Sequence, residues 1–295
     1  MRTQPIRPAP GHLSPARLLL AFAFALCALC SRAQAEWQQA KYGAVPGGYN
    51  FWITLPQDYL ASGHPLPVVI FLHGQSLCGN DLNRVKRYGT LDAIAMGRTV
   101  EAIVLAPQNP GGAWSPKKIN DMLEWTKRHY KVDTTRVSVL GMSLGGYGTL
   151  DFAGTYPQKV AAAMALCGGS TLKNPERLGD VPLWIMHGTA DRAVSINESK
   201  KVVARMQAAD ADKRLRYDWL QGASHGALAR AFYLSQTYDW LLSHSTADPG
   251  RPVNRIIPIT QADMQQAYTT LGKRAQQILS ELDYGDYLIE IPASQ

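Results

Sequence analysis

Short apolar runs of strand length recur along this chain of 295 residues and restrict its fold more than any other feature. Residues 67–72 read PVVIFL, without a charged side chain. Comparable runs lie at residues 102–106, 137–140, 161–166 and 182–186, and residues 49–55 and 215–220 are read as further strands. Continuous apolar runs are typical of parallel strands that are covered on both faces.

Helical patterns separate several of these runs. Ser115 is placed to cap a helix that has Pro116 at its first position, and Ile119, Met122 and Leu123 then form an apolar face. Alternation of strand and helix predicts an α/β fold with a mostly parallel central sheet flanked by helices. In such sheets ligands bind beyond the carboxyl ends of the strands, so the residues that follow each run are the candidates for function.

The first 35 residues are read as a secretory signal peptide that is cleaved near Ala35. Three arginines precede the apolar run at residues 18–30, and Ala-Gln-Ala follows it. Thirteen residues fall short of the roughly 20 that a membrane-spanning helix needs, so we expect no stable membrane insertion. The mature protein is expected in the periplasm or secreted. A lipid anchor on Cys27 or Cys30 is the alternative, although a leucine stands before each cysteine where a small residue is normal.

The net charge of the remaining chain restricts the class of partner that it can bind. The signal segment holds four arginines and no acid, which leaves 26 basic and 23 acidic residues, a net charge of +3. No block of Lys and Arg remains, and we predict no nucleic-acid partner.

Residues 36–248 are expected to form one catalytic domain. Residues 249–295 form a C-terminal extension with a helical pattern over 261–282, either packed on the domain or mobile. The sequence leaves the oligomeric state open.

The segment Gly141-Met142-Ser143-Leu144-Gly145 follows the run at 137–140 and opens a helical pattern. A Gly-x-Ser-x-Gly segment between strand and helix predicts a strained turn that exposes the serine as a nucleophile. Glycine is needed on both sides because a Cβ there would collide with neighbouring backbone. The alternative is a structural serine in a glycine-rich turn.

A serine hydroxyl needs a base and an acid that orients the base. Asp191 follows the run at 182–186, and His225 lies 34 residues later in a glycine-flanked loop. The order serine, acid, histidine is the order of α/β-hydrolases, so Ser143, Asp191 and His225 are the predicted triad. The other histidines and acids are expected to have no catalytic role. His73 and His187 are expected to be structural, and His244 to lie on the surface. Asp180, Asp210 and Asp212 are expected to cap helices or to be solvated.

Backbone amides must stabilise the oxyanion that forms during acyl transfer. Leu144 N–H, directly after the nucleophile, and Gln75 N–H, in the loop after His73-Gly74, are the candidates. Trp114 either lines the acyl pocket or packs in the core.

Four ordered motifs carry a resemblance to a known family: FLHGQSLCGND, VDTTRVSVLGMSLGGYG, PLWIMHGTADRAV and GASHG. Over residues 49–242 the chain resembles α/β-hydrolases of the phospholipase/carboxylesterase and predicted-peptidase groups, akin to feruloyl esterases and polyhydroxybutyrate depolymerases. The resemblance implies the α/β-hydrolase fold and the same triad and oxyanion amides. About a dozen residues join the strands ending near residue 167 and starting near 181, too few for a lid domain, so an open site is expected.

The expected reaction is hydrolysis of a small-molecule or polymer-linked carboxylic ester through an acyl-enzyme on Ser143. No set of His, Cys and Glu has zinc-ligand spacing, and no metal or cofactor is expected. Cys78 and Cys167 both follow strands near the catalytic edge, which raises the hypothesis of a disulfide in an exported protein. A serine peptidase of the same fold and a non-catalytic hydrolase-like binding protein remain as alternatives.

Overall fold

The computed structural model describes residues 37–56, 59, 63–269 and 271. The predicted signal peptide therefore lies outside the described residues. The strands are β1 (Gln38–Lys41), β2 (Phe51–Thr54), β3 (Leu66–Leu72), β4 (Ile103–Pro107), β5 (Val132–Met142), β6 (Ala162–Leu166), β7 (Leu183–Gly188) and β8 (Leu215–Leu220). The α-helices are α3 (Thr90–Ala95), α4 (Pro116–His129), α5 (Leu144–Thr155), α6 (Ile196–Ala208), α7 (Ser235–Leu242) and α8 (Gln261–Gln265). Short 3-10 helices are η1 (Gln75–Leu77), η2 (Leu82–Lys86), η3 (Pro175–Asp180) and η4 (Gly226–Tyr233).

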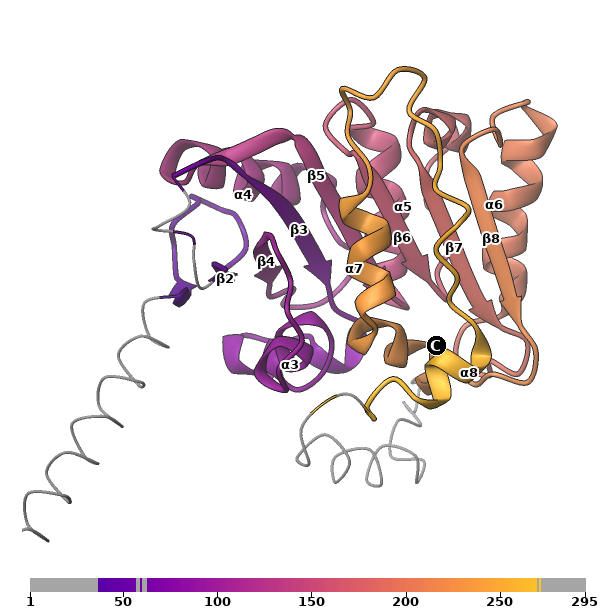
Figure 1. Ribbon diagram of the computed structural model, residues 1–295, viewed down its shortest axis with the longest axis horizontal. Coiled ribbons are helices and arrows are strands. Elements are labelled where there is room, and N and C mark those ends of the chain that lie inside the picture. The colour runs from indigo at the N-terminus through magenta and orange to yellow at the C-terminus, as the bar shows by residue number, and fades with distance from the viewer. Residues whose placement is uncertain (1–36, 57–58, 60–62, 270, 272–295) are drawn as a thin grey trace, which may run out of the picture.

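The strands form one eight-stranded sheet in the order β1-β2-β4-β3-β5-β6-β7-β8. The pairs β1-β2 and β2-β4 are antiparallel. The remaining pairs, β4-β3, β3-β5, β5-β6, β6-β7 and β7-β8, are parallel. All the strands predicted from apolar runs are present, and the predicted mostly parallel sheet is confirmed. Parallel pairing brings the carboxyl ends of β3, β5, β6, β7 and β8 to the same edge of the sheet (Figure 1).

Helices cover both faces of this sheet (Figure 1). One face packs on α4, α5 and α6, and the other on α3, α7 and the segment that carries α8. In β3 the side chains of Val69 and Phe71 enter one core, and those of Val68 and Ile70 enter the other. Both sets are fully buried, which is why this strand reads as a continuous apolar run.

Helix α4 begins as its sequence predicts. Ser115 Oγ accepts a hydrogen bond from Lys118 N–H at 3.3 Å, and Pro116 occupies the first position, where its missing N–H costs nothing. Ile119, Met122 and Leu123 are fully buried against the sheet. The helix therefore forms because an N-cap and an apolar stripe coincide.

The C-terminal extension, as far as Leu271, packs on the domain. Trp240 Nε1–H donates to Asn254 O at 2.8 Å, and Met264 and Tyr268 are buried in the same core as α7. The predicted helix over 261–282 is wrong for residues 266–269, which form turns. The helix ends at Gln265 because the next amide shares the carbonyls of Ala262 and Asp263, a tightening that closes the last turn. The remainder of that prediction lies outside the described residues.

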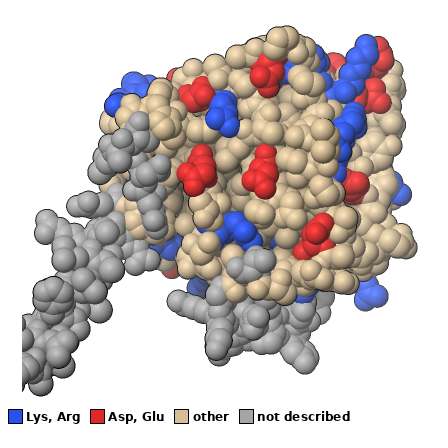
Figure 2. All heavy atoms as spheres, viewed as in Figure 1, with Lys and Arg blue, Asp and Glu red and all other residues tan. Residues whose placement is uncertain are grey.

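Charged side chains do not gather on the face shown in Figure 2, where acidic and basic residues are intermixed among uncharged ones. Among the described helices none is both long enough and apolar enough to cross a membrane.

Candidate active site

Ser143 lies at the turn between β5 and α5 with φ 58° and ψ −122°. A non-glycine residue with positive φ is strained, and such strain clusters at functional sites. The turn leaves no room for side chains on its flanks. A Cβ on Gly145 would lie 1.9 Å from Leu72 O, and one on Gly141 would lie 2.4 Å from Gly145 O. Ser143 N–H donates to Leu166 O at 2.9 Å, which ties the turn to the end of β6.

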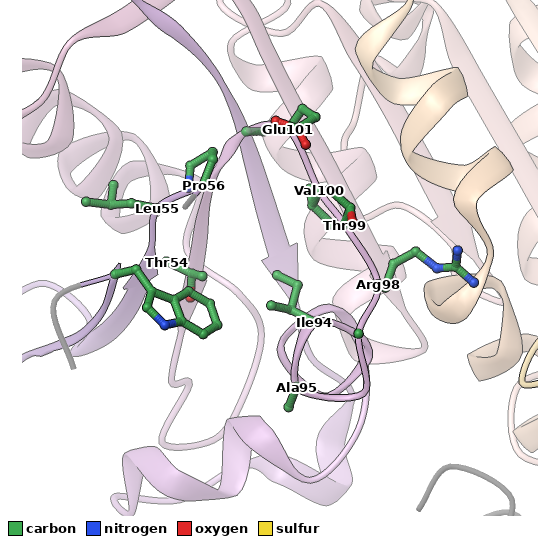
Figure 3. A pocket seen from close by; sticks show the side chains of 12 residues that line it. Thr54, Leu55, Pro56, Ile94, Ala95, Arg98, Thr99, Val100 and Glu101 are labelled. Carbon is green, nitrogen blue, oxygen red and sulfur yellow. The ribbon is translucent and has the colours of Figure 1, made fainter. Parts of the chain in front are cut away.

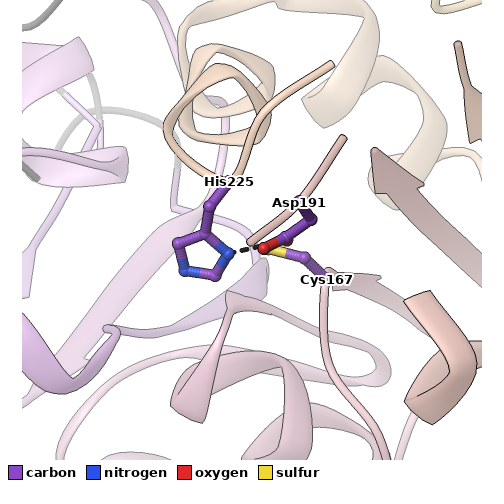
Figure 4. Close-up of side chains that lie close together, drawn as sticks. All are labelled: Cys167, Asp191 and His225. Atoms are coloured by element: carbon purple, nitrogen blue, oxygen red, sulfur yellow. Dashed lines mark hydrogen bonds and ion pairs between the residues drawn. The ribbon is translucent and has the colours of Figure 1, made fainter. Parts of the chain in front are cut away.

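Asp191 and His225 meet at the same sheet edge. Asp191 follows β7, and His225 follows the neighbouring strand β8 and precedes η4. His225 Nδ1 donates to Asp191 Oδ2 at 2.7 Å (Figure 4). The carboxylate is fully buried, whereas the imidazole keeps 12% of its side-chain surface exposed. This hydrogen bond fixes one tautomer of His225 and leaves its Nε2 as an acceptor.

Several donors hold the Asp191 carboxylate in place. Oδ1 accepts from Ala193 N–H and Val194 N–H, each at 2.9 Å, and Oδ2 also faces His187 Nε2 at 3.3 Å. Burial by itself would raise the pKa of Asp191, but hydrogen bonds from His187, His225 and Val194 hold that pKa well below its usual range. Asp191 is therefore a carboxylate at any pH near neutrality.

His187 is a second histidine on this carboxylate, a contact that sequence reasoning missed. It is fully buried, and its Nδ1 lies 2.8 Å from Ser199 Oγ, which donates to Gly168 O at 2.5 Å. The imidazole therefore links Asp191 to α6 and to the loop after β6. The available signal was the i, i+4 spacing of His187, near the end of β7, and Asp191, in the loop that follows.

His244 is buried, with 3% of its surface exposed, so its predicted place on the surface is wrong. Its Nδ1–H donates to Trp240 O at 2.7 Å, and its Nε2 accepts from Asn254 N–H at 3.0 Å. The extension returns over α7 and covers this side chain, which the helical pattern alone does not reveal.

The two predicted oxyanion amides lie on two segments whose backbones approach each other beside Ser143. Leu144 is the first residue of α5, directly after Ser143. Gln75 opens η1 after Gly74, and a Cβ built on Gly74 would lie 3.6 Å from Ser143 Cβ. The backbone of the loop after β3 therefore passes beside the predicted nucleophile.

Trp114 lies in the core and not on an open pocket. It is 4% exposed, its Nε1–H donates to His73 O at 3.2 Å, and its ring centroid lies 4.9 Å from that of His73. A Cβ on Gly148 of α5 would lie 2.7 Å from the indole. Of the two roles considered for Trp114, the structure favours packing, because the indole fills the space between the loop after β3 and α5.

Cys78 and Cys167 are free thiols, which corrects the disulfide hypothesis. They follow β3 and β6, and β5 lies between these strands. Cys78 lies beyond η1 and is partly exposed, whereas Cys167 is buried, so the two thiols have different surroundings. Cys167 is fully buried against Asp191, and burial followed by the Asp191 charge raises the pKa of its thiol well above the usual range.

The side chains of Cys167, Asp191 and His225 form a potential metal-donor set (Figure 4). Their ligand atoms lie within 4.8 Å of one another, a cluster found by searching only the described residues. The spacing of these residues in the sequence does not reveal the cluster, because three separate loops contribute to it. His225 Nδ1–H already donates to Asp191 Oδ2, which also contacts His187 Nε2 at 3.3 Å, so Asp191 and His225 are engaged with each other as an acid–histidine pair.

A cavity of about 390 Å³ lies elsewhere (Figure 3). It is lined by Trp37, residues 54–56 at the end of β2, the end of α3 and residues 97–102 before β4. The amino end of β4 borders it, whereas Ser143, Asp191 and His225 follow the carboxyl ends of parallel strands. The cavity is therefore at the opposite edge of the sheet from the predicted triad.

The known proteins that this chain resembles are hydrolases. The dienelactone hydrolase family matches residues 112–238. Poly(3-hydroxyalkanoate) depolymerase C of Paucimonas lemoignei is 27% identical over 170 residues, which are 52% of this chain and 39% of that protein. Acetylxylan esterase A of Emericella nidulans is 29% identical over 147 residues, 44% of this chain and 46% of that protein. The match spans less than half the length of either relative.

Solved structures share the fold. A thermostable esterase superposes with a TM-score of 0.59 at 23% identity over 71% of this chain and 64% of that one. S-formylglutathione hydrolase of Staphylococcus aureus gives a TM-score of 0.53 at 18% identity over 70% of this chain and 98% of that one. From its sheet, its strained serine turn and these similarities, the chain has the α/β-hydrolase fold, and the dienelactone hydrolase family matches its central part.

Proposed function

We propose that this protein is an exported serine hydrolase that cleaves carboxylic esters through an acyl-enzyme on Ser143. One observation carries the proposal: the 2.7 Å hydrogen bond between Asp191 and His225 lies at the sheet edge that also presents Ser143 in a strained turn. An acid–histidine pair at the same sheet edge as such a serine has the parts needed to activate a hydroxyl group.

In the proposed mechanism, Ser143 Oγ attacks the ester carbonyl carbon while His225 Nε2 takes the hydroxyl proton. Asp191 stabilises the imidazolium that forms, and the amides of Gln75 and Leu144 stabilise the oxyanion. The imidazolium then protonates the leaving alcohol. Water, deprotonated by His225, then attacks the acyl-enzyme, and the imidazolium returns the proton to Ser143 Oγ as the carboxylic acid leaves.

The names of the two relatives indicate a broad substrate class. One relative is named for a polyhydroxyalkanoate, a polyester, and the other for acetylated xylan, which carries acetyl esters, so both names describe polymers that contain ester bonds. We include polymer-linked esters together with soluble esters in the proposed substrate class. The catalytic domain is assigned to residues 36–248, and export depends on the predicted signal peptide at residues 1–35.

Hydrolysis of p-nitrophenyl acetate, butyrate and octanoate by the mature protein tests the proposal, with Ser143→Ala as the matched variant. Turnover by the wild type that is lost in Ser143→Ala is the expected result, and the dependence on acyl length bounds the pocket. Turnover that survives in Ser143→Ala would contradict the proposal. Absence of ester turnover together with cleavage of peptide p-nitroanilides would favour the serine peptidase, and inertness toward both would favour the binding protein.

A further inference from the structure

The peptide between Gly74 and Gln75 is held from its carbonyl side. Gly74 O accepts from His73 Nδ1–H at 2.7 Å and from Leu77 N–H at 3.2 Å. His73 is fully buried, and its Nε2 accepts from Asn109 N–H at 3.0 Å, which leaves the single proton on Nδ1. In a trans peptide the C=O and N–H groups point in opposite directions. Holding this carbonyl therefore directs Gln75 N–H away from His73.

The same loop is held from its other side by Tyr88. Gly74 N–H donates to Tyr88 Oη at 3.1 Å, and Ser76 Oγ donates to the same oxygen at 3.3 Å. Tyr88 is only 6% exposed. A Cβ on Gly74 would lie 2.9 Å from Tyr88 Oη and 3.6 Å from Ser143 Cβ, so the phenol and the nucleophile lie close to the same glycine.

A further hydrogen-bonded link joins Tyr88 to the element that follows His225. The next residue, Gly89, donates its N–H to Tyr233 Oη at 3.3 Å, and Tyr233 Oη donates to Asp92 Oδ2 at 2.7 Å. Tyr233 is the last residue of η4, which begins directly after His225. The loop that carries the proposed oxyanion amide and the element that follows the base are thus tied through the backbone around Tyr88.

We infer that Tyr88 is a positioning residue, whose hydroxyl holds the Gly74–Gln75 backbone so that Gln75 N–H is directed at the oxyanion. The inference rests on the proposed function of Ser143. Oxyanion donors act by being fixed before the reaction, and a misplacement of about 1 Å can cost roughly 100-fold in rate. Tyr88 contacts neither substrate nor reacting atoms in this role.

The test compares Tyr88→Phe with Tyr238→Phe, a matched loss of a buried tyrosine hydroxyl. Tyr238 is 2% exposed, and its Oη bonds Phe232 O and Thr90 Oγ1, not the loop at Gly74. For Tyr88→Phe we expect kcat to fall roughly 10- to 100-fold with little change in KM. Affinity for a trifluoromethyl ketone, which mimics the tetrahedral intermediate, should fall by the same factor as kcat/KM. Tyr238→Phe should lose stability but keep kcat and ketone affinity.

Two results would overturn the inference: wild-type kcat in Tyr88→Phe, or equal losses of kcat in the two variants, which would indicate a merely structural role. If Tyr88→Phe fails to fold, Ser76→Ala, which removes the second hydrogen bond between this loop and Tyr88 Oη, is measured in its place. A smaller fall in kcat at constant KM supports the inference, and unchanged kcat overturns it. Failure of the proposed function is recognised separately, because the wild type itself would then lack Ser143-dependent turnover, and the inference would fall with it.

Discussion

Asp191 accepts more hydrogen bonds than orienting one histidine requires. His225 is its expected partner, while His187, two backbone amides and the nearby Cys167 thiol complete its surroundings. A buried carboxylate is costly unless donors compensate for its lost hydration. These donors keep Asp191 ionised and immobile, which suits a group that must stabilise an imidazolium.

Replacement of Asp191 by asparagine should leave the fold intact and lower kcat by roughly 10³- to 10⁴-fold, because the amide no longer favours the tautomer of His225 that accepts the serine proton. Steady-state hydrolysis of p-nitrophenyl butyrate measures the effect. Asp151→Asn is the control, since Asp151 is also buried but bonds Ser170 and Thr171. A comparable loss of kcat in the control would argue against the triad.

His73 should make the stability of the protein depend on pH. Burial lowers the pKa of His73 from 6.5 to about 4, despite the hydrogen bond to Gly74 O. Between these values the unfolded chain binds a proton that the native state does not, so this contribution is complete above pH 6.5 and is lost as the pH falls toward 4. The full effect is on the order of 3 kcal/mol.

Urea unfolding at pH 7 and pH 4.5 tests this expectation in the wild type and in His73→Asn. The free energy of unfolding should fall more steeply with acidification in the wild type, because the variant lacks the titrating group. Equal slopes for the two proteins would show that His73 is not held neutral.

At the scale of elements, the turn from β5 into α5 depends on the close approach of three backbone segments. Leu72 ends β3, Gly141 pairs with it in β5, and Gly145 lies in the first turn of α5. These backbones approach so closely that only glycine fits. The strained serine is thus a consequence of packing a helix directly onto the strand ends.

Gly145→Ala should destabilise the protein by at least about 3 kcal/mol, because the new Cβ would lie 1.9 Å from Leu72 O and backbone would have to move. Gly226→Ala is the matched control, since a Cβ there meets nothing within 4 Å. Its change in the free energy of unfolding should stay within about 0.5 kcal/mol. Thermal unfolding followed by circular dichroism distinguishes them, and similar Tm values would refute the close approach.

At the scale of the whole molecule, the segment that begins at Arg251 completes the hydrophobic core on the face of the sheet covered by α3 and α7. Arg251 donates to Pro157 O at 3.1 Å, and Met264, Ala267 and Tyr268 are buried in the same core as η4 and α7. The ring centroids of Tyr268 and Tyr233 lie 4.7 Å apart. The extension therefore supports the element that follows His225, and it lies beyond the residues matched by the dienelactone hydrolase family.

Met264→Ala should cost about 2–5 kcal/mol in the free energy of unfolding, because it removes a side chain that is 4% exposed from a packed core. Ile256→Ala, in the same segment but 90% exposed, should cost less than about 0.5 kcal/mol. Chemical denaturation of both variants provides the measurement. A small loss for Met264→Ala would mean that the extension is not part of the cooperative fold.

The sequence by itself determined every described strand except β1, the helix at Ser115 and the positions of Ser143, Asp191 and His225 at strand ends. Apolar runs, caps and glycine-flanked turns are local signals, and each acts within a few residues of its own position. The parallel sheet then follows from their alternation, since parallel strands bring their carboxyl ends to one edge.

Only the tertiary structure decided what surrounds those residues. The hydroxyl of Tyr88 on Gly74, the burial of Trp114 and His244, and the free state of the Cys78 and Cys167 thiols all depend on how loops pack around the sheet. The reach of the C-terminal segment over α7 is of the same kind. Contacts between residues distant in sequence are set by the packing of whole elements, and no local pattern of side chains records which loops will touch.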